Sequence, residues 1–165
     1  MLTRNELVAN LDFEIRLATP DDIEQLVRLH EHFFDQTALP SHGVDFDEDR
    51  LRLWLGRCLS KGSIPHIVAC DAEKVLIGWI SYGLDQSFTI QPWAYLDKFY
   101  VLPSWRGSLV PRALVKLMLD CARDDGAKAF QVIVGSGSHA APSVINLFRK
   151  FGFHVMDGAM LAKEI

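Results

Sequence analysis

The chain has 165 residues, of which 49% are hydrophobic and 23% are charged, and its formal net charge is −4. These values are close to the averages for soluble globular domains, and they exclude a disordered tail, a collagen-like repeat or a coiled coil as the main design. The acidic balance argues against broad binding to nucleic acid, which favours basic surfaces.

The N-terminal half predicts a short arm at 1–12 followed by alternating strands and helices. The arm lacks the long apolar stretch of a signal peptide. Thr19, Pro20 and two aspartates form a strong helix start, because Thr can cap a helix, Pro suits its first position and acids favour its positive end. The apolar spacing predicts a strand at 13–17, helices at 23–34 and 45–60, and strands at 66–70 and 75–84 around a hairpin at 71–74.

The C-terminal half continues the alternation. It predicts a strand at 93–102, a helix at 111–123, a strand at 130–134, a flexible loop at 135–138, a helix at 140–150 and a strand pair over 153–164 that turns at 157–158. Strands interleaved with helices predict an α/β domain with one mixed sheet, spanning 13–165. No apolar run approaches the roughly 18 residues that a spanning helix needs, so we expect no membrane partner and a cytoplasmic location.

The cysteines and histidines predict neither disulfides nor a metal site. Cys58, Cys70 and Cys121 are odd in number, widely spaced and without a CxxC pair. Each lies among apolar residues, where a thiol behaves as a small hydrophobe, so we expect core filler. His30 and His32 do not share a helix face, and the histidines form no metal set.

The stretch 95–108 and the helix after it carry the most chemical information. They form a strand, a tight loop and a helix N-terminus, whose first N–H groups have no internal partners and suit phosphate. Arg106 and Gly107 lie in the loop. Arg112 and Lys116 lie in the first helical turns, so a pyrophosphate would be a natural ligand. The alternative is an ordinary strand, turn and helix with solvated arginines.

The run 101–108, VLPSWRGS, followed by Leu114, resembles the acyl-CoA-binding signature of the GNAT superfamily of N-acetyltransferases. That signature reads Arg or Gln, two residues, Gly, one residue, then Gly or Ala. Residues 15–22 look like the first strand and helix start of the family, and residues 146–153 look like its last helix running into the final strands. The order of elements agrees as well, and the resemblance covers the chain from residue 13 onward.

The resemblance implies a GNAT-like mixed sheet with helices on both faces, in which the strand at 93–102 splays from the strand at 130–134. It also implies acetyl-CoA as co-substrate, with the pantetheine arm paired to the backbone of the first of these strands. The pyrophosphate would lie on the loop at 106–111. The residues expected to bind the cofactor are Phe99, Tyr100, Val101, Arg106, Gly107, Ser108, Val110 and Arg112.

In such a protein an amine attacks the thioester directly, without an acyl-enzyme. The protein must orient both substrates, polarise the carbonyl group and manage protons. The resemblance therefore implies an N-acetyltransferase that acts on a primary amine of a small molecule or a protein. It implies no metal, and it leaves open a homodimer.

Three positions depart from the family pattern. Leu109 and Pro111 stand where the signature has its two small residues, and Pro111 has no N–H to donate, although it suits the start of a helix. Phe148 stands where the family often has a tyrosine acid, and it has no proton to give, so we expect it in the core. These departures favour an alternative, a GNAT-fold sensor or interaction module that binds CoA weakly or not at all.

Candidates for proton transfer lie on the cleft strand and in the later loop. Strand alternation predicts that the odd-numbered residues from Tyr95 to Val101 share one face. Asp97 could take the amine proton directly or through water, pair with the substrate cation, or be a surface acid paired with Lys or Arg. Tyr95 could form a hydrogen bond or pack as an aromatic ring. Ser138 could donate to the leaving thiol or cap a helix.

The acceptor site, in this resemblance, is built from the first two helices and the loop before the cleft strand. Acids and aromatic rings there would suit a cationic amine. The alternative is structural, because acids belong at the start of a helix and Trp54 and Trp79 suit the core. The residues concerned are Asp35, Asp45, Asp47, Glu48, Asp49, Phe34, Trp54, Trp79, Phe88 and Trp93.

Overall fold

A computed structural model of the protein describes residues 12–134, 141–156 and 160–164. Its helices and strands are β1 (Phe13–Leu17), α1 (Ile23–Phe34), α2 (Glu48–Lys61), β2 (His66–Asp71), β3 (Leu76–Asp85), β4 (Trp93–Val101), α3 (Val110–Asp124), β5 (Ala129–Ile133), α4 (Ala141–Arg149), β6 (His154–Met156) and β7 (Met160–Glu164). The predicted helices and strands are thus confirmed, with small shifts at their ends. Residues 1–11 of the expected arm, the loop at 135–138 and the turn at 157–158 lie outside the described residues.

Acidic side chains organise the starts of the first two helices. Asp47 precedes α2, and its Oδ1 accepts a hydrogen bond of 2.9 Å from the N–H of Arg50. The helix expected from residue 45 therefore begins only after this cap. Ahead of α1, the buried carboxylate of Asp22 accepts bonds of 2.7 and 2.8 Å from the Arg16 guanidinium and one of 2.7 Å from the N–H of Thr19. This pairing with Arg16 is what allows Asp22 to be buried, and it holds the pKa of Asp22 below its usual range.

The strands form one seven-stranded mixed sheet in the order β1-β2-β3-β4-β5-β7-β6. Neighbouring strands are antiparallel except for β4 and β5, which run parallel. The parallel ladder joins Ala94 to Phe130 and Tyr95 to Gln131. Among the described residues it goes no further, although β4 continues to Val101. Most of the edge of β4 that faces β5 is therefore without a strand partner.

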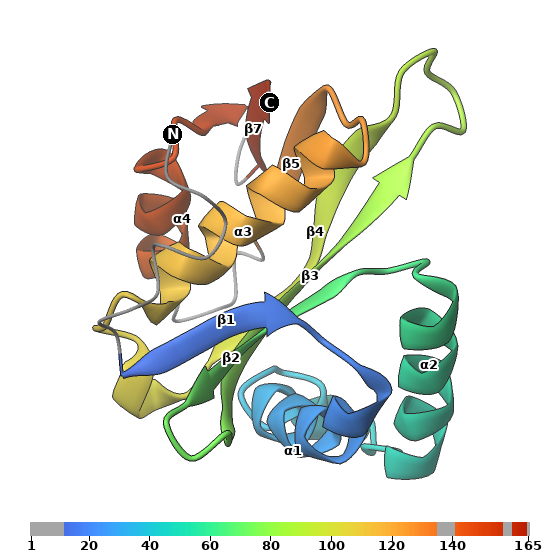
Figure 1. The fold of residues 1–165 in the computed structure, drawn as a ribbon, viewed down its shortest axis with the longest axis vertical. Helices are drawn as coiled ribbons and strands as arrows, with labels where there is room; N and C mark the ends of the chain where they lie inside the picture. Colours follow the sequence, from blue (N-terminus) through green and yellow to red (C-terminus); the bar gives the residue numbers. More distant parts are fainter. Residues whose placement is uncertain (1–11, 135–140, 157–159, 165) are drawn as a thin grey trace.

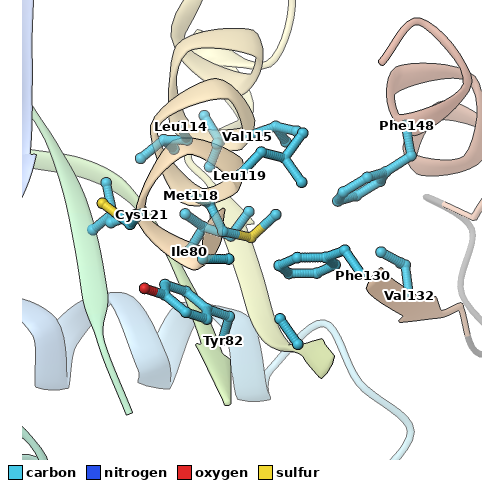
Figure 2. Packing of buried hydrophobic residues seen from close by; sticks show 14 of the residues in the cluster. Ile80, Tyr82, Leu114, Val115, Met118, Leu119, Cys121, Phe130, Val132 and Phe148 are labelled. Atoms are coloured by element: carbon cyan, nitrogen blue, oxygen red, sulfur yellow. The ribbon is translucent and has the colours of Figure 1, made fainter. Parts of the chain in front are cut away.

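Helices cover both faces of the sheet, as predicted: α1 and α2 lie on one side and α3 and α4 on the other (Figure 1). The larger cluster of buried side chains lies under α3 and α4, where Met118 packs over β3 and Phe148 points from α4 toward Phe130 (Figure 2). Phe148 is fully buried, which confirms its expected core role. The smaller cluster lies under α1 and α2 around Trp79. All three cysteines are buried, as expected of core filler.

A β-bulge interrupts β4 in its middle. In the ladder between β3 and β4, Ser81 lies opposite Lys98, but the next residue of β3 lies opposite Leu96. Asp97 is therefore an extra residue that has no counterpart on β3. An inserted residue of this kind reverses the order in which later side chains alternate between the faces.

The bulge overturns the expectation that the odd-numbered residues from Tyr95 to Val101 share one face. Phe99 and Val101 pack with the cluster under α3. Tyr95, Asp97 and Lys98 lie on the face of α1 and α2, where they contact Gly83, Ser81 and Trp54, respectively. Simple alternation is wrong here because it assumes an unbroken ladder.

Candidate functional site

Asp97 is the charged group at the bulge of β4. Its Oδ2 accepts a hydrogen bond of 3.0 Å from Ser81 Oγ, and both of its oxygens lie 3.1 Å from Lys98 Nζ. Lys98 Nζ also lies 5.1 Å from the centre of the Trp54 ring on α2. The side chain of Asp97 is 21% exposed, so a carboxylate held by two donors still reaches solvent. Pairing with a Lys, one of the three alternatives for Asp97, is thus present, and a carboxylate that reaches solvent remains open to a substrate.

Three aromatic rings follow the same face toward the hairpin that joins β3 and β4. The ring centroids of Tyr95 and Trp93 lie 5.9 Å apart, and those of Trp93 and Phe88 lie 6.4 Å apart. The Tyr95 ring lies against Gly83 of β3, where a Cβ would overlap it. Phe88 is 79% exposed. Rings placed in this way can contact an apolar group or a cation.

Three of the five acids expected near an acceptor, Asp47, Glu48 and Asp49, serve α2 instead. Asp47 caps the helix, and Arg52 forms ion pairs at 2.9 Å with Glu24 of α1 and with Glu48 and Asp49 in the first turn of α2. These contacts favour the structural alternative, in which the acids stabilise the helix start and its contact with α1.

The three β4 residues expected to bind a cofactor lie where the strand has no β5 partner. Phe99 packs edge-on against Phe148, with ring centroids 6.4 Å apart. Tyr100 is 5% exposed and packs against Phe33 of α1, with centroids 6.1 Å apart. Val101 is buried under α3. Since these side chains serve the two cores, the groups of this segment that remain for a ligand are main-chain groups on the edge toward β5.

The loop before α3 presents unsatisfied N–H groups. Ser108 Oγ accepts a bond of 3.1 Å from the N–H of Val110 and donates one of 2.7 Å to a carbonyl of the preceding turn. Within residues 105–113, all of which the structure describes, the N–H groups of Gly107, Leu109 and Arg112 have no hydrogen-bond partner in the protein. They lie at the positive end of α3, where an anion is stabilised.

Arg106 is held by neutral groups. Its Nε donates to the Val101 carbonyl at 2.9 Å, and its Nη2 donates to Gln36 Oε1 at 2.7 Å. The guanidinium carbon lies 5.4 Å from the centre of the Tyr100 ring. No carboxylate of the described residues lies within ion-pair distance of Arg106. The positive charge of Arg106 is therefore available to an anion.

Two buried histidines lie near Ser81 and Trp79 of β3. His66 of β2 is opposite Ser81 in the sheet and is 1% exposed, and burial lowers its pKa. His30 of α1 stacks on Trp79 with ring centroids 4.1 Å apart, and burial lowers its pKa to about 4. Burial thus keeps both rings neutral near neutral pH. Nδ1 of each ring lies 2.8 Å from a main-chain carbonyl oxygen, so Nδ1 carries the proton.

The reasoning from sequence missed Ser81, Gly83 and Gln36. Alternation along β3 places Ser81 and Gly83 on the face of Trp79, so a pattern that could have found them is present. Gln36 follows the end of α1, and no local pattern points to its contact with Arg106. Ser138, the third residue expected to handle protons, lies outside the described residues.

The described residues contain neither a cluster of metal-ligating side chains nor a helix that could span a membrane. No three His, Cys, Asp or Glu side chains gather there as they would to hold a metal ion. No described helix is long and apolar enough to cross a membrane.

Comparisons with known proteins agree on a family and a fold. The model of a family described as the acetyltransferase (GNAT) family matches residues 24–153. A search of curated proteins found no match.

Among solved structures, a GNAT superfamily phosphinothricin acetyltransferase from Sinorhizobium meliloti, in complex with AcCoA, is similar with a TM-score of 0.75 and 17% identity, over 94% of this chain and 89% of that one. A GNAT family N-acetyltransferase from Escherichia coli, in complex with CoA, gives 0.64 and 20%, over 93% and 82%. A GCN5-related glucosamine N-acetyltransferase region of a fungal multi-domain GH3 β-N-acetylglucosaminidase gives 0.69 and 19%, over 92% of this chain but 18% of that longer one. At these identities the likeness establishes the fold.

Proposed function

This chain belongs to the acetyltransferase (GNAT) family, and from that premise we propose that it transfers an acetyl group from acetyl-CoA to a primary amine of a small molecule or a protein. One observation carries the proposal. The unpartnered edge of β4 leads directly into a loop that combines open N–H groups with an uncompensated arginine. An extended polar arm with a pyrophosphate at its end, which is the shape of the CoA chain, is complementary to both.

In the proposed complex, the main chain of Phe99, Tyr100 and Val101 pairs with the pantetheine arm. The pyrophosphate accepts hydrogen bonds from the N–H groups of Gly107 and Arg112 and lies near the Arg106 guanidinium. Ser108 Oγ and the N–H of Val110 bond each other in the free protein and exchange that bond for phosphate contacts. The AcCoA and CoA bound in two structural neighbours support this cofactor choice.

Direct transfer forms the amide C–N bond and breaks the thioester C–S bond, and the thiol leaves as CoA. In this proposal Asp97 accepts the proton that the attacking amine loses, directly or through water. Ser81 fixes the carboxylate for this task. Tyr95 lies beside Asp97 on the same face and contacts the acceptor, and Ser138 donates to the leaving thiolate. Phe148 takes no part in proton transfer because its ring is buried in the core.

A second candidate function follows from the loop. Ser108 Oγ already accepts the N–H of Val110, and Pro111 has no N–H. The free loop therefore offers fewer N–H donors to a phosphate than a loop with the full family signature would. A GNAT-fold module that binds CoA weakly, and acts as a sensor or interaction domain, would keep these features.

The experiment that separates the two candidates measures thiol release from acetyl-CoA with a panel of primary amines. The panel covers alkylamines, arylalkylamines, polyamines, amino acids and lysine peptides. The proposed function expects enzyme-dependent release with at least one class. Release no faster than the buffer blank for every amine, at saturating acetyl-CoA, would favour the non-catalytic module.

A further inference from the structure

We propose that Gln36 is a positioning residue for the phosphate end of the cofactor site. It fixes the Arg106 guanidinium through a neutral amide, so that the arginine keeps its full positive charge for the CoA pyrophosphate. The inference rests on the proposed function, because it concerns how Arg106 is used there.

The contacts of Gln36 fix both ends of its amide. Gln36 Oε1 accepts the bond of 2.7 Å from Arg106, and Nε2 donates a bond of 3.0 Å to the Tyr100 hydroxyl. An arginine has donors and no acceptor, so the oxygen of the amide must face it. The position of Gln36 is itself set by its N–H, which donates at 3.1 Å to the carbonyl of Phe33 at the end of α1. Gln36 therefore has one orientation, and it joins α1 to a loop far along the chain.

The neutrality of these partners is the important property. A guanidinium has five N–H donors. Arg106 uses one on Nε for Val101 and one on Nη2 for Gln36. Its other donors have no partner among the described residues, and the side chain is exposed. A carboxylate in place of Gln36 would satisfy the same geometry but would pair with Arg106 and compete with phosphate. The amide holds the arginine in place without that competition.

The isosteric variant Gln36→Glu tests this directly. It preserves the size and the acceptor atom, but it creates an ion pair with Arg106. We expect the Kd of acetyl-CoA to rise about tenfold, as for the loss of one charge-assisted contact, whereas the KM of S-acetylpantetheine, which carries no phosphate, stays unchanged. The midpoint of thermal unfolding should not fall, since an ion pair replaces the neutral contact with Arg106 and the Tyr100 hydroxyl can donate to the carboxylate instead of accepting from the amide.

Gln91→Glu is the matched control. Gln91 is exposed in the hairpin before β4, at the other end of the strand from Arg106, and the substitution adds the same charge to the chain. We expect wild-type affinity for both donors. Wild-type affinity of the Gln36→Glu variant for acetyl-CoA would overturn the inference. An equal loss of affinity for acetyl-CoA and S-acetylpantetheine, together with a lower unfolding midpoint, would also overturn it, because it would show a merely structural role.

Inorganic pyrophosphate distinguishes this inference from the proposed function. Suppose that no amine releases thiol but the wild-type protein binds pyrophosphate. If Gln36→Glu weakens pyrophosphate binding and Gln91→Glu does not, the enzymatic proposal fails but the role of Gln36 stands. If the wild-type protein binds neither acetyl-CoA nor pyrophosphate, both fail.

Discussion

Asp97 is itself the inserted residue of the β4 bulge, and this position determines which groups surround it. At the scale of the residue, the bulge places Lys98 on the same face as Asp97, toward α1 and α2, where Ser81 and Lys98 hold the carboxylate. A carboxylate in a regular strand would be fixed by neighbours across the ladder, whereas this one has a hydroxyl donor beside it and remains in contact with solvent. That combination suits a group that must both hold its position and exchange a proton.

Replacing Asp97 with Asn tests that role. Asn retains the acceptor for Ser81 and the size of the side chain, but it cannot take a proton. If Asp97 is the base, kcat should fall by about 100-fold or more, whereas the Kd of acetyl-CoA should stay close to the wild-type value. Steady-state kinetics and calorimetry give the two numbers. Equal kcat for both proteins across the neutral and alkaline range would exclude Asp97 as the base.

His30 makes folding stability depend on pH. Burial lowers its pKa to about 4 in the folded chain, against about 6.5 when unfolded. As the pH falls, the unfolded chain takes up the proton first, so the stability due to neutral His30 is complete above about pH 6.5 and is lost progressively toward about pH 4. Between about pH 7 and about pH 5 this loss is about 2 kcal/mol.

The variant His30→Phe removes this titration and retains a ring that can stack on Trp79. Its free energy of unfolding in urea should fall by about 2 kcal/mol less than that of the wild type between about pH 7 and about pH 5. His66 titrates in both proteins, so a residual slope is expected. Identical slopes in the two proteins would contradict the assignment.

At the scale of the element, β3 and β4 form a matched pair, because Gly83 leaves room for the Tyr95 ring. We expect Gly83→Ala to destabilise the fold by about 1–3 kcal/mol, because the added Cβ displaces the ring. In a Tyr95→Ala background the same change should cost much less, giving a coupling energy in a double-mutant cycle measured by urea unfolding.

A glycine in a helix provides the control for that experiment. A Cβ at Gly56 of α2 would meet no atom within 4 Å. Gly56→Ala should therefore be neutral or stabilising, by up to about 1 kcal/mol, from helix propensity. Comparable destabilisation by both alanines would show that the cost at Gly83 is not steric.

The elements themselves were predictable from the sequence because local chemistry determines them. β1 follows from the alternation in 13–17, and α1 follows from its capping residues and apolar stripe. The bulge was not predictable, since an inserted residue is defined only relative to the partner strand. The contact between Gln36 and Arg106 was missed for the same reason, because it joins segments 70 residues apart.

At the scale of the whole molecule, the net charge of −4 excludes a broad basic surface but not a local one. The charge of Arg106 is left uncompensated at the helix end where N–H groups are open, whereas Arg16 and Arg52 are paired with acids. An acidic protein can therefore bind an anionic cofactor at one place. The resemblance to the family signature puts the proposed cofactor site at this loop, although the side-chain bonds within the loop were not evident from it.

Calorimetric titration with acetyl-CoA is the measurement that tests this account most directly, with S-acetylpantetheine titrated in parallel. The account predicts one site per chain that prefers acetyl-CoA, and an unfolding midpoint that rises with ligand concentration by mass action. No heat of binding and no shift of the midpoint at about 1 mM acetyl-CoA, which corresponds to an affinity weaker than about −4 kcal/mol, would contradict it.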